Sequence, residues 1–141
     1  MKNLLKLVGP SVLMWLCFVI SGAAQIVNGL TFTTTFPFYA GNTKMPAGSY
    51  TVRPAAFGST TLMIEDSTGK YSAFVEFVPT QSESGHKSAD VTFNKYGGVD
   101  FLNRLWVGGQ QYGMVVEETK YEKKLAESGP PQKHTVTGTP K

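Results

Sequence analysis

Residues 91–107 read VTFNKYGGVDFLNRLWV, two apolar runs joined by the pair Gly97-Gly98. Apolar and polar side chains largely alternate in each run, which is the period-two pattern of a strand with two unlike faces. Two such runs around a Gly-Gly turn predict a β-hairpin, because glycine adopts the positive φ angles of a tight turn without strain. The segment therefore indicates a β-protein.

The same pattern recurs on both sides of this hairpin. Residues 30–38 alternate threonines with apolar side chains, so that Leu30, Phe32, Phe36 and Phe38 share one face. Further strands are predicted at residues 49–53, 60–65, 71–78 and 112–116, with turn residues between them. Evenly spaced short strands predict an all-β fold, a small antiparallel β-sandwich or barrel of about seven to eight strands.

The last part of the chain departs from this alternation. Residues 117–127 are rich in helix formers, and they predict a short C-terminal helix. Residues 128–141 contain Pro130-Pro131 and few apolar side chains, and they predict a disordered tail. The β domain is accordingly expected to span residues 25–127.

The first 24 residues have the layout of a secretory signal peptide. Lys2 and Lys6 flank the start of an apolar run over residues 7–20, and small residues follow up to Ala24, where cleavage is expected. A membrane span needs about 20 apolar residues, more than this run supplies, so no stable membrane anchor is expected after cleavage. The predicted location is the periplasm, the cell surface or the extracellular space.

Loss of the leader changes the charge and cysteine content. The remaining 117 residues carry 11 basic and 10 acidic side chains, a net charge near +1. So small a charge gives no electrostatic footprint for nucleic acid. The only cysteine, Cys17, leaves with the leader, so neither a disulfide nor a cysteine-ligated metal is expected.

Three segments occur in a characteristic order: FPFYAGN at residues 36–42, MPAGSYTV at 45–52, and FNKYG followed by FL and W within 93–106. In this order they resemble a family of small exported β-proteins common in acidobacterial genomes. The resemblance implies export and the β topology, and the family has no assigned activity. Asn94-Lys95 stand where members often have a His-Arg pair. The second segment alone is similar to a turn and strand of transthyretin-like and CnaB-type surface modules.

Residues suited to catalysis or metal binding are sparse. His86 and His134 are the only histidines and lie far apart in the sequence, so no metal site and no cofactor are predicted. The segment Ser82–His86 places Ser, Glu and His on one loop, without the rigid nucleophile that a catalytic triad requires. Glu76 and Asp100 remain as candidate catalytic carboxylates, and a hydrolase is the third functional hypothesis.

The aromatic strands offer a better candidate site. In residues 99–107, Leu102, Arg104 and Trp106 are expected to share one face, while the opposite face is also apolar. Phe74 and Glu76 share a face of the strand at residues 71–78. These five residues form the predicted ligand or partner face.

Two functional hypotheses remain ahead of catalysis. The first is an exported, non-catalytic β-module with a structural or protein-interaction role, whose partner is a second copy or another exported protein. Its possible assembly strand comprises Thr31, Phe32, Thr33, Phe36 and Phe38, which would pair either with a neighbouring sheet edge or within its own sheet. The alternative is a small barrel or sandwich that binds an apolar or carbohydrate ligand through Trp106 and neighbouring aromatic side chains.

Overall fold

The computed structural model describes residues 29–141, so the predicted signal peptide lies outside the described residues. The described residues form ten strands and one short helix. In chain order these are β1 (Leu30–Thr34), β2 (Phe38–Ala40), β3 (Thr43–Met45), β4 (Gly48–Pro54), β5 (Thr61–Asp66), β6 (Ser72–Gln81), β7 (Ala89–Tyr96), β8 (Val99–Trp106), β9 (Tyr112–Val116), α1 (Lys120–Ala126) and β10 (Gln132–Pro140).

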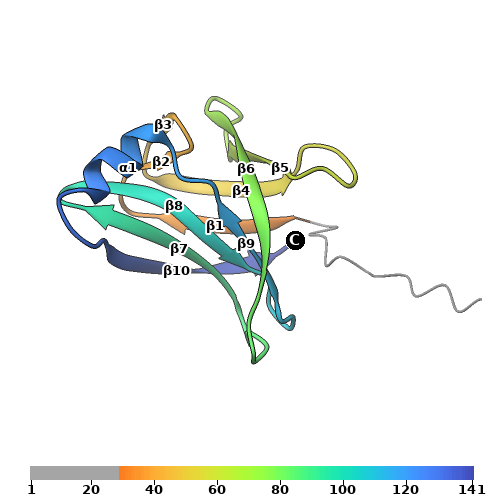
Figure 1. Ribbon diagram of the computed structural model, residues 1–141. Helices are drawn as coiled ribbons and strands as arrows, with labels where there is room; N and C mark the ends of the chain where they lie inside the picture. Colours follow the sequence, from red (N-terminus) through yellow and green to blue (C-terminus); the bar gives the residue numbers. More distant parts are fainter. Residues whose placement is uncertain (1–28) are drawn as a thin grey trace, which may run out of the picture.

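Eight of these strands close into an antiparallel barrel (Figure 1), in the order β8-β7-β10-β1-β4-β5-β6-β9. The ring closes because β8 pairs with β7 on one side and with β9 on the other, where Trp106 lies opposite Gly113. Closure pairs the edges that an open sheet would leave exposed. The predicted all-β fold is confirmed, and the barrel is the form that it takes.

The hairpin of β2 and β3 stands outside the ring of eight. Since β9 reaches only the second half of β8, the first half pairs with β2, and Tyr39 lies opposite Phe101. Helix α1 lies at the same end of the molecule (Figure 1), where the ring of Tyr121 contacts both aromatic rings at centroid distances of 5.4 and 5.5 Å. Aromatic packing thus fixes the helix on the outer surface of the barrel.

Aromatic side chains fill the barrel interior. Phe32, Phe38, Tyr50 and Phe93, the four-ring cluster, come from four different strands, and each is at most 3% exposed. Five pairs of these rings have centroids between 5.1 and 6.1 Å apart. The hydroxyl of Tyr50 donates a hydrogen bond to the carbonyl of Pro46. Burial of each side chain stabilises the fold by about 1.5–3 kcal/mol, so this cluster is a principal source of stability.

Residues 128–141 do not form the predicted disordered tail. Strand β10 lies inside the sheet, where it pairs with β7 over seven residues and with β1 over three. The predicted domain boundary at residue 127 is wrong for the same reason, and α1 is followed by a strand. Only His134, Val136 and Gly138 of β10 lie on the inward face, opposite Phe93, Val91 and Ala89. Because only one of these three side chains is apolar, the sequence of β10 does not show the alternation that predicts a strand.

The predicted assembly strand is also an internal strand of the barrel. Both edges of β1 are occupied, since Thr31 lies opposite Thr139 on one side and Thr51 on the other. Phe32 and Phe38 belong to the four-ring cluster, and the hydroxyl of Thr33 lies 2.8 Å from that of Ser49. Phe36 packs against the core. Assembly through a free edge of this strand is therefore wrong, and the alternative of pairing within its own sheet holds.

The place of β10 in the barrel can be tested at Gly138. A Cβ atom there would lie 2.8 Å from Cδ1 of Leu30, so Gly138→Val must displace a core side chain. We expect a loss of about 1–3 kcal/mol in the free energy of unfolding, measured by chemical denaturation. Thr139→Val, at the exposed neighbouring position, is the control and should be near neutral. Equal stability of the two variants would show that these residues lie outside the barrel.

Candidate functional site

Strands β6 and β9 carry apolar side chains on an outer surface that continues onto β8. Phe74 and Val78 of β6 are 62% and 54% exposed. Val78 pairs with Val115 of β9, and Val115 pairs with Arg104 of β8, so these side chains form one row across the surface. Glu76 stands on β6 between Phe74 and Val78. We call Phe74, Glu76, Val78, Val115 and Arg104 the β6 face.

The two charged residues of the β6 face are held by neighbouring side chains. The hydroxyls of Thr60 and Thr61 donate hydrogen bonds to the two carboxylate oxygens of Glu76, at 3.2 and 2.5 Å. The guanidinium carbon of Arg104 lies 5.8 Å from the ring centroid of Trp106, a cation–π contact. The buried Nε of Arg104 has no hydrogen-bond partner among the described residues. The face therefore presents both signs of charge beside its apolar side chains.

The indole of Trp106 is not the exposed ligand-binding surface that the sequence predicted. Its side chain is only 8% exposed. The imidazole of His86 stacks on the indole, with ring centroids 4.1 Å apart and an interplanar angle of 13°. The backbone of Gly113 is so close that a Cβ atom there would lie 2.5 Å from the indole. Because the chain itself covers the ring, Trp106 is not an exposed surface for a ligand, and the alternative of a ligand-binding barrel or sandwich stays a prediction.

Leu102 lies on the opposite side of the sheet from the β6 face. The pairing of β7 with β8 shifts register, so that Thr92 faces Arg104 and the next residue, Phe93, faces Leu102. Asn103 is the extra residue of this β-bulge, and it reverses the alternation along β8. Leu102 is consequently 2% exposed in the core, while Arg104 points outward. The prediction that Leu102 shares a face with Arg104 and Trp106 is wrong, whereas Phe74, Glu76 and Arg104 do share one outer surface.

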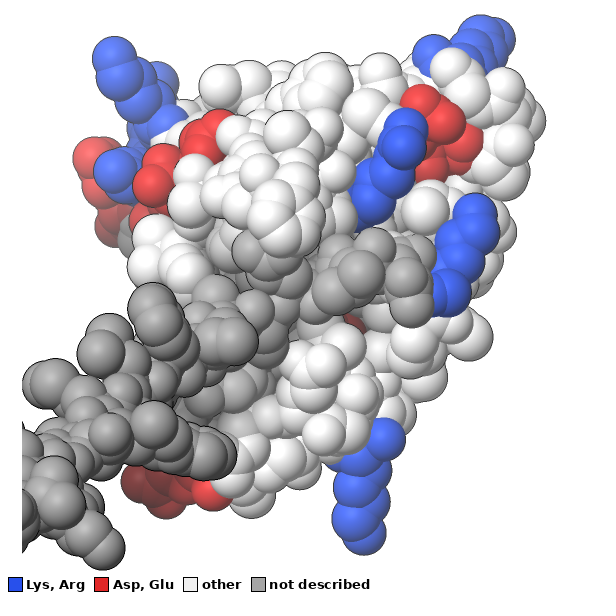
Figure 2. Space-filling view, turned by 90° about the vertical axis from the view of Figure 1, so that its right-hand side faces the viewer, with Lys and Arg blue, Asp and Glu red and all other residues white. Residues whose placement is uncertain are grey.

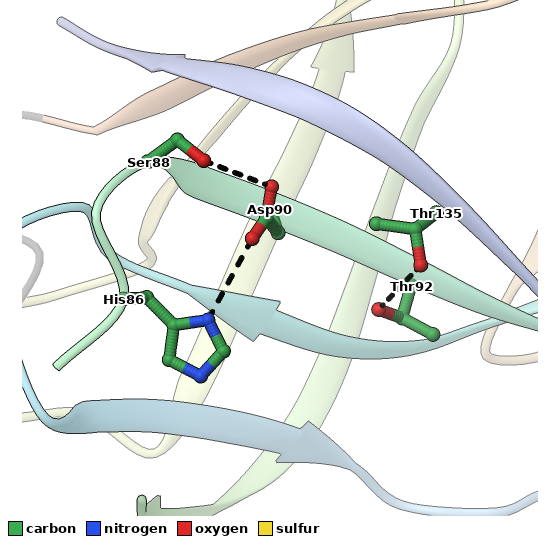
Figure 3. Close-up of polar contacts among 5 residues, drawn as sticks. All are labelled: His86, Ser88, Asp90, Thr92 and Thr135. Carbon is green, nitrogen blue, oxygen red and sulfur yellow. Dashed lines mark hydrogen bonds and ion pairs between the residues drawn. The ribbon is translucent and has the colours of Figure 1, made fainter. Parts of the chain in front are cut away.

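The loop that carries His86 contains a second polar cluster (Figure 3). Nδ1 of His86 lies 3.6 Å from one carboxylate oxygen of Asp90, and Oγ of Ser88 donates to the other at 3.3 Å. Both side chains turn toward Asp90 rather than toward each other. A catalytic triad requires the serine to bond to the histidine. This cluster instead attaches the loop to β7.

A third cluster joins residues that the sequence had kept apart. Nδ1 of His134 lies 3.0 Å from Oδ1 of Asp100, and the aspartate side chain is 5% exposed. The ring of Phe36 packs edge-on against the imidazole, at a centroid distance of 5.2 Å. An Asp–His pair needs a third group, a nucleophile or a metal ligand, before it can act. Within residues 29–141, no three His, Cys, Asp or Glu side chains converge on one point.

Helix α1 carries a buried carboxyl group, which the sequence analysis missed. Glu122 is 3% exposed and accepts a hydrogen bond from Nδ2 of Asn94 at 3.2 Å. Lys133 of β10 donates to Oδ1 of Asn94 at 2.6 Å and to Oδ1 of Asn103 at 3.5 Å. Burial raises the pKa of Glu122, and the hydrogen bond from Asn94 offsets this only in part. The cluster ties α1 to β7 and β10.

A groove of about 390 Å³ crosses the outer surface of β10, β1 and β4. Most of its lining residues are threonines and serines: Thr31, Thr33, Ser49, Thr51, Ser67, Thr137 and Thr139. Three of these hydroxyls form two hydrogen bonds within the groove, Thr33 with Ser49 and Thr31 with the carbonyl of Thr139. At the end of the barrel seen in Figure 2, basic and acidic side chains are interspersed and most of the surface is uncharged.

Comparison with known proteins adds no assignment. No protein-family model matches the chain, and neither the curated proteins nor the solved structures contain a match. The resemblance to exported acidobacterial β-proteins therefore stays a prediction. Within the described residues, no helix has both the length and the apolar character that a membrane crossing demands.

The raised pKa of Glu122 predicts a specific pH dependence of stability. Ionisation costs more in the folded state, so the contribution of this group is full below its ordinary pKa of 4.5 and declines as the pH rises through the raised folded value. Glu122→Gln cannot ionise and escapes this decline. The melting temperature of the variant relative to wild type should therefore increase between about pH 4 and about pH 7. A difference that stays constant or falls over this range would contradict the assignment.

Proposed function

We propose that this chain is an exported, non-catalytic β-barrel module with a structural or protein-interaction role in the periplasm or at the cell surface. We further propose that it pairs with a second copy of itself through the β6 face. The observation that carries this proposal is the exposure of Phe74 and Val78 on a regular strand, with Glu76 and Arg104 on the same surface. Export rests on the leader pattern of residues 1–24.

Exposed apolar side chains on a rigid sheet gain stability when a partner covers them. Burial of each such side chain is worth about 1.5–3 kcal/mol, and a strand requires no ordering before it binds. Phe74 and Val78 lie two pleats apart on β6, so a flat partner can cover both. Exposed apolar side chains gathered on one face are typical of interaction sites.

The charges of the face favour a second copy as the partner. A two-fold dimer uses the same patch on both subunits, so each residue meets a different residue of the same patch. Glu76 on β6 and Arg104 on β8 are separated by β9. A two-fold axis near Val115 therefore brings Glu76 of one copy toward Arg104 of the other, which supports pairing of opposite charges.

The non-catalytic part of the proposal rests on how the polar groups are used. The interior is occupied by the four-ring cluster, which supports a packed core rather than a ligand cavity. Glu76, one of the two candidate carboxylates, accepts hydrogen bonds from threonine hydroxyls, and Asp100, the other, is paired with His134. These contacts are typical of groups that hold a fold together.

Pairing through the β6 face can be tested by light scattering. We expect the wild-type chain, expressed from its full sequence, to shift from monomer to dimer over about a hundredfold concentration range, because association follows mass action. Phe74→Ser with Val78→Ser should keep the chain monomeric. Phe57→Ser is the matched control, since Phe57 is 97% exposed but lies on the β4–β5 loop. A wild-type chain that is monomeric throughout, or a control that also loses the dimer, would refute the proposal.

The charge arrangement gives an independent prediction. Glu76→Arg and Arg104→Glu should each raise the dimer dissociation constant about tenfold at low salt, since each places like charges across the interface. The two changes in one chain should restore most of the affinity, because the pair is then reversed rather than broken. Sedimentation or light scattering measures all four constants. If the double variant is weaker than either single variant, these two residues do not meet in the dimer.

A further inference from the structure

The segment between α1 and β10 has the composition and position of a hinge. Residues 127–131 contain Gly129, whose φ of +140° is one that side chains other than glycine rarely adopt, and then Pro130-Pro131. Consecutive prolines favour an extended backbone. A pocket of about 250 Å³ lies between this segment and its surroundings, lined by Tyr96, Leu125 and Pro130 among others. The hinge is thus incompletely packed against the barrel.

Strand β10 buries little apolar surface in the barrel, and its side-chain contacts are mostly polar, from Lys133 to Asn94 and from His134 to Asp100. Its outward residues are exposed, and of its inward residues only Gly138 is fully buried, while Val136 is half-buried against the core. Burial of apolar side chains is the main stabilising term for most strands, and here it is small. Pairing with β1 ends after three residues, at Phe32 and Gly138. The strand can therefore leave its slot at less cost than the strands that carry the four-ring cluster.

The slot between β1 and β7 nevertheless selects for the sequence of β10. Gly138 is required because Leu30 occupies the space that a side chain would need. Val136, two residues before Gly138, packs against the core. His134, two residues before Val136, contacts Asp100. The slot thus accepts a strand with His, Val and Gly at alternate positions. A second copy of this chain supplies such a strand.

We propose that two copies of the chain exchange β10, each inserting its C-terminal strand between β1 and β7 of the other. An exchanged dimer keeps every contact of β10 and changes only the path of the hinge, so it competes with the monomer once the chain concentration is high. Pro130-Pro131 favours an extended backbone, which a hinge that reaches a second copy requires. This exchange is independent of the β6 face, because it uses a different surface and either can occur without the other.

A mixed-chain disulfide experiment tests the exchange. Thr92 of β7 lies opposite Thr135 of β10, with their hydroxyl oxygens 3.4 Å apart (Figure 3). Cα atoms of paired residues lie within the range that a disulfide can bridge. One chain carries Thr92→Cys and the other Thr135→Cys, both with Cys17→Ser to remove the only natural cysteine. The two are mixed at high concentration, unfolded in denaturant, refolded together and oxidised.

The control replaces Thr135→Cys by Thr139→Cys. Thr139 is an exposed residue of the same strand, but it lies four residues further along, about 13 Å from the position opposite Thr92. Exchange predicts that the 92–135 cross-link between unlike chains forms at several times the yield of the 92–139 cross-link, as measured by mass spectrometry. Equal yields would mean random collision of exposed thiols and would overturn the proposal.

A second arm separates this result from the β6 face. The same mixture is prepared with Phe74→Ser and Val78→Ser in both chains. If β10 is exchanged, the 92–135 cross-link should form at an unchanged yield, since Phe74 and Val78 do not touch the slot. Loss of the cross-link in this background would show that the two chains meet only through the β6 face, and exchange of β10 would be refuted.

Discussion

The structure depends on one packing constraint, the filling of the barrel interior by the four-ring cluster. Phe32, Phe38, Tyr50 and Phe93 come from parts of the chain up to 61 residues apart, and their rings pack together inside the closed barrel. An eight-stranded barrel is just wide enough for its interior to be filled by side chains. With the interior occupied, the outer surface and the loops at the barrel ends are the places left for recognition. The cluster therefore sets both the shape of the fold and the location of any site.

Much of the fold could be predicted because most strands show one apolar and one polar face. The alternation located all the long strands except β10, and the Gly97-Gly98 turn lies where it was predicted, with Gly97 at a φ of +62°. Strand β10 was missed because its inward positions are His134, Val136 and Gly138, of which two are not apolar. Those residues suit the slot because His134 pairs with Asp100 of β8, and because Gly138 leaves space for Leu30 of β1. Local pattern cannot show a requirement set by residues far away in the sequence.

The candidate site, too, could be predicted only where the backbone keeps a regular alternation. Phe74, Glu76 and Arg104 were assigned to a surface by alternation, and the barrel brings them to one outer face. Leu102 was misassigned because a single extra residue, Asn103, reverses the alternation along β8. Trp106 was misread because a loop residue twenty positions earlier, His86, covers it. A bulge and a loop contact are both small changes in backbone path, and each determines which side chains reach solvent.

The position of β10 also sets the order in which the molecule can be completed during synthesis. The ribosome makes the chain from its N-terminus, and domains generally fold as units once their sequence is available. Here β10 belongs between two strands made earlier, so β1 and β7 each keep one edge of unpaired backbone groups until β10 has been made. The hairpins can form beforehand, but the ring cannot close until β10 has been made. A chain terminated before β10 would therefore form an open sheet with two unpaired strand edges. Proteases and chaperones recognise such a form readily.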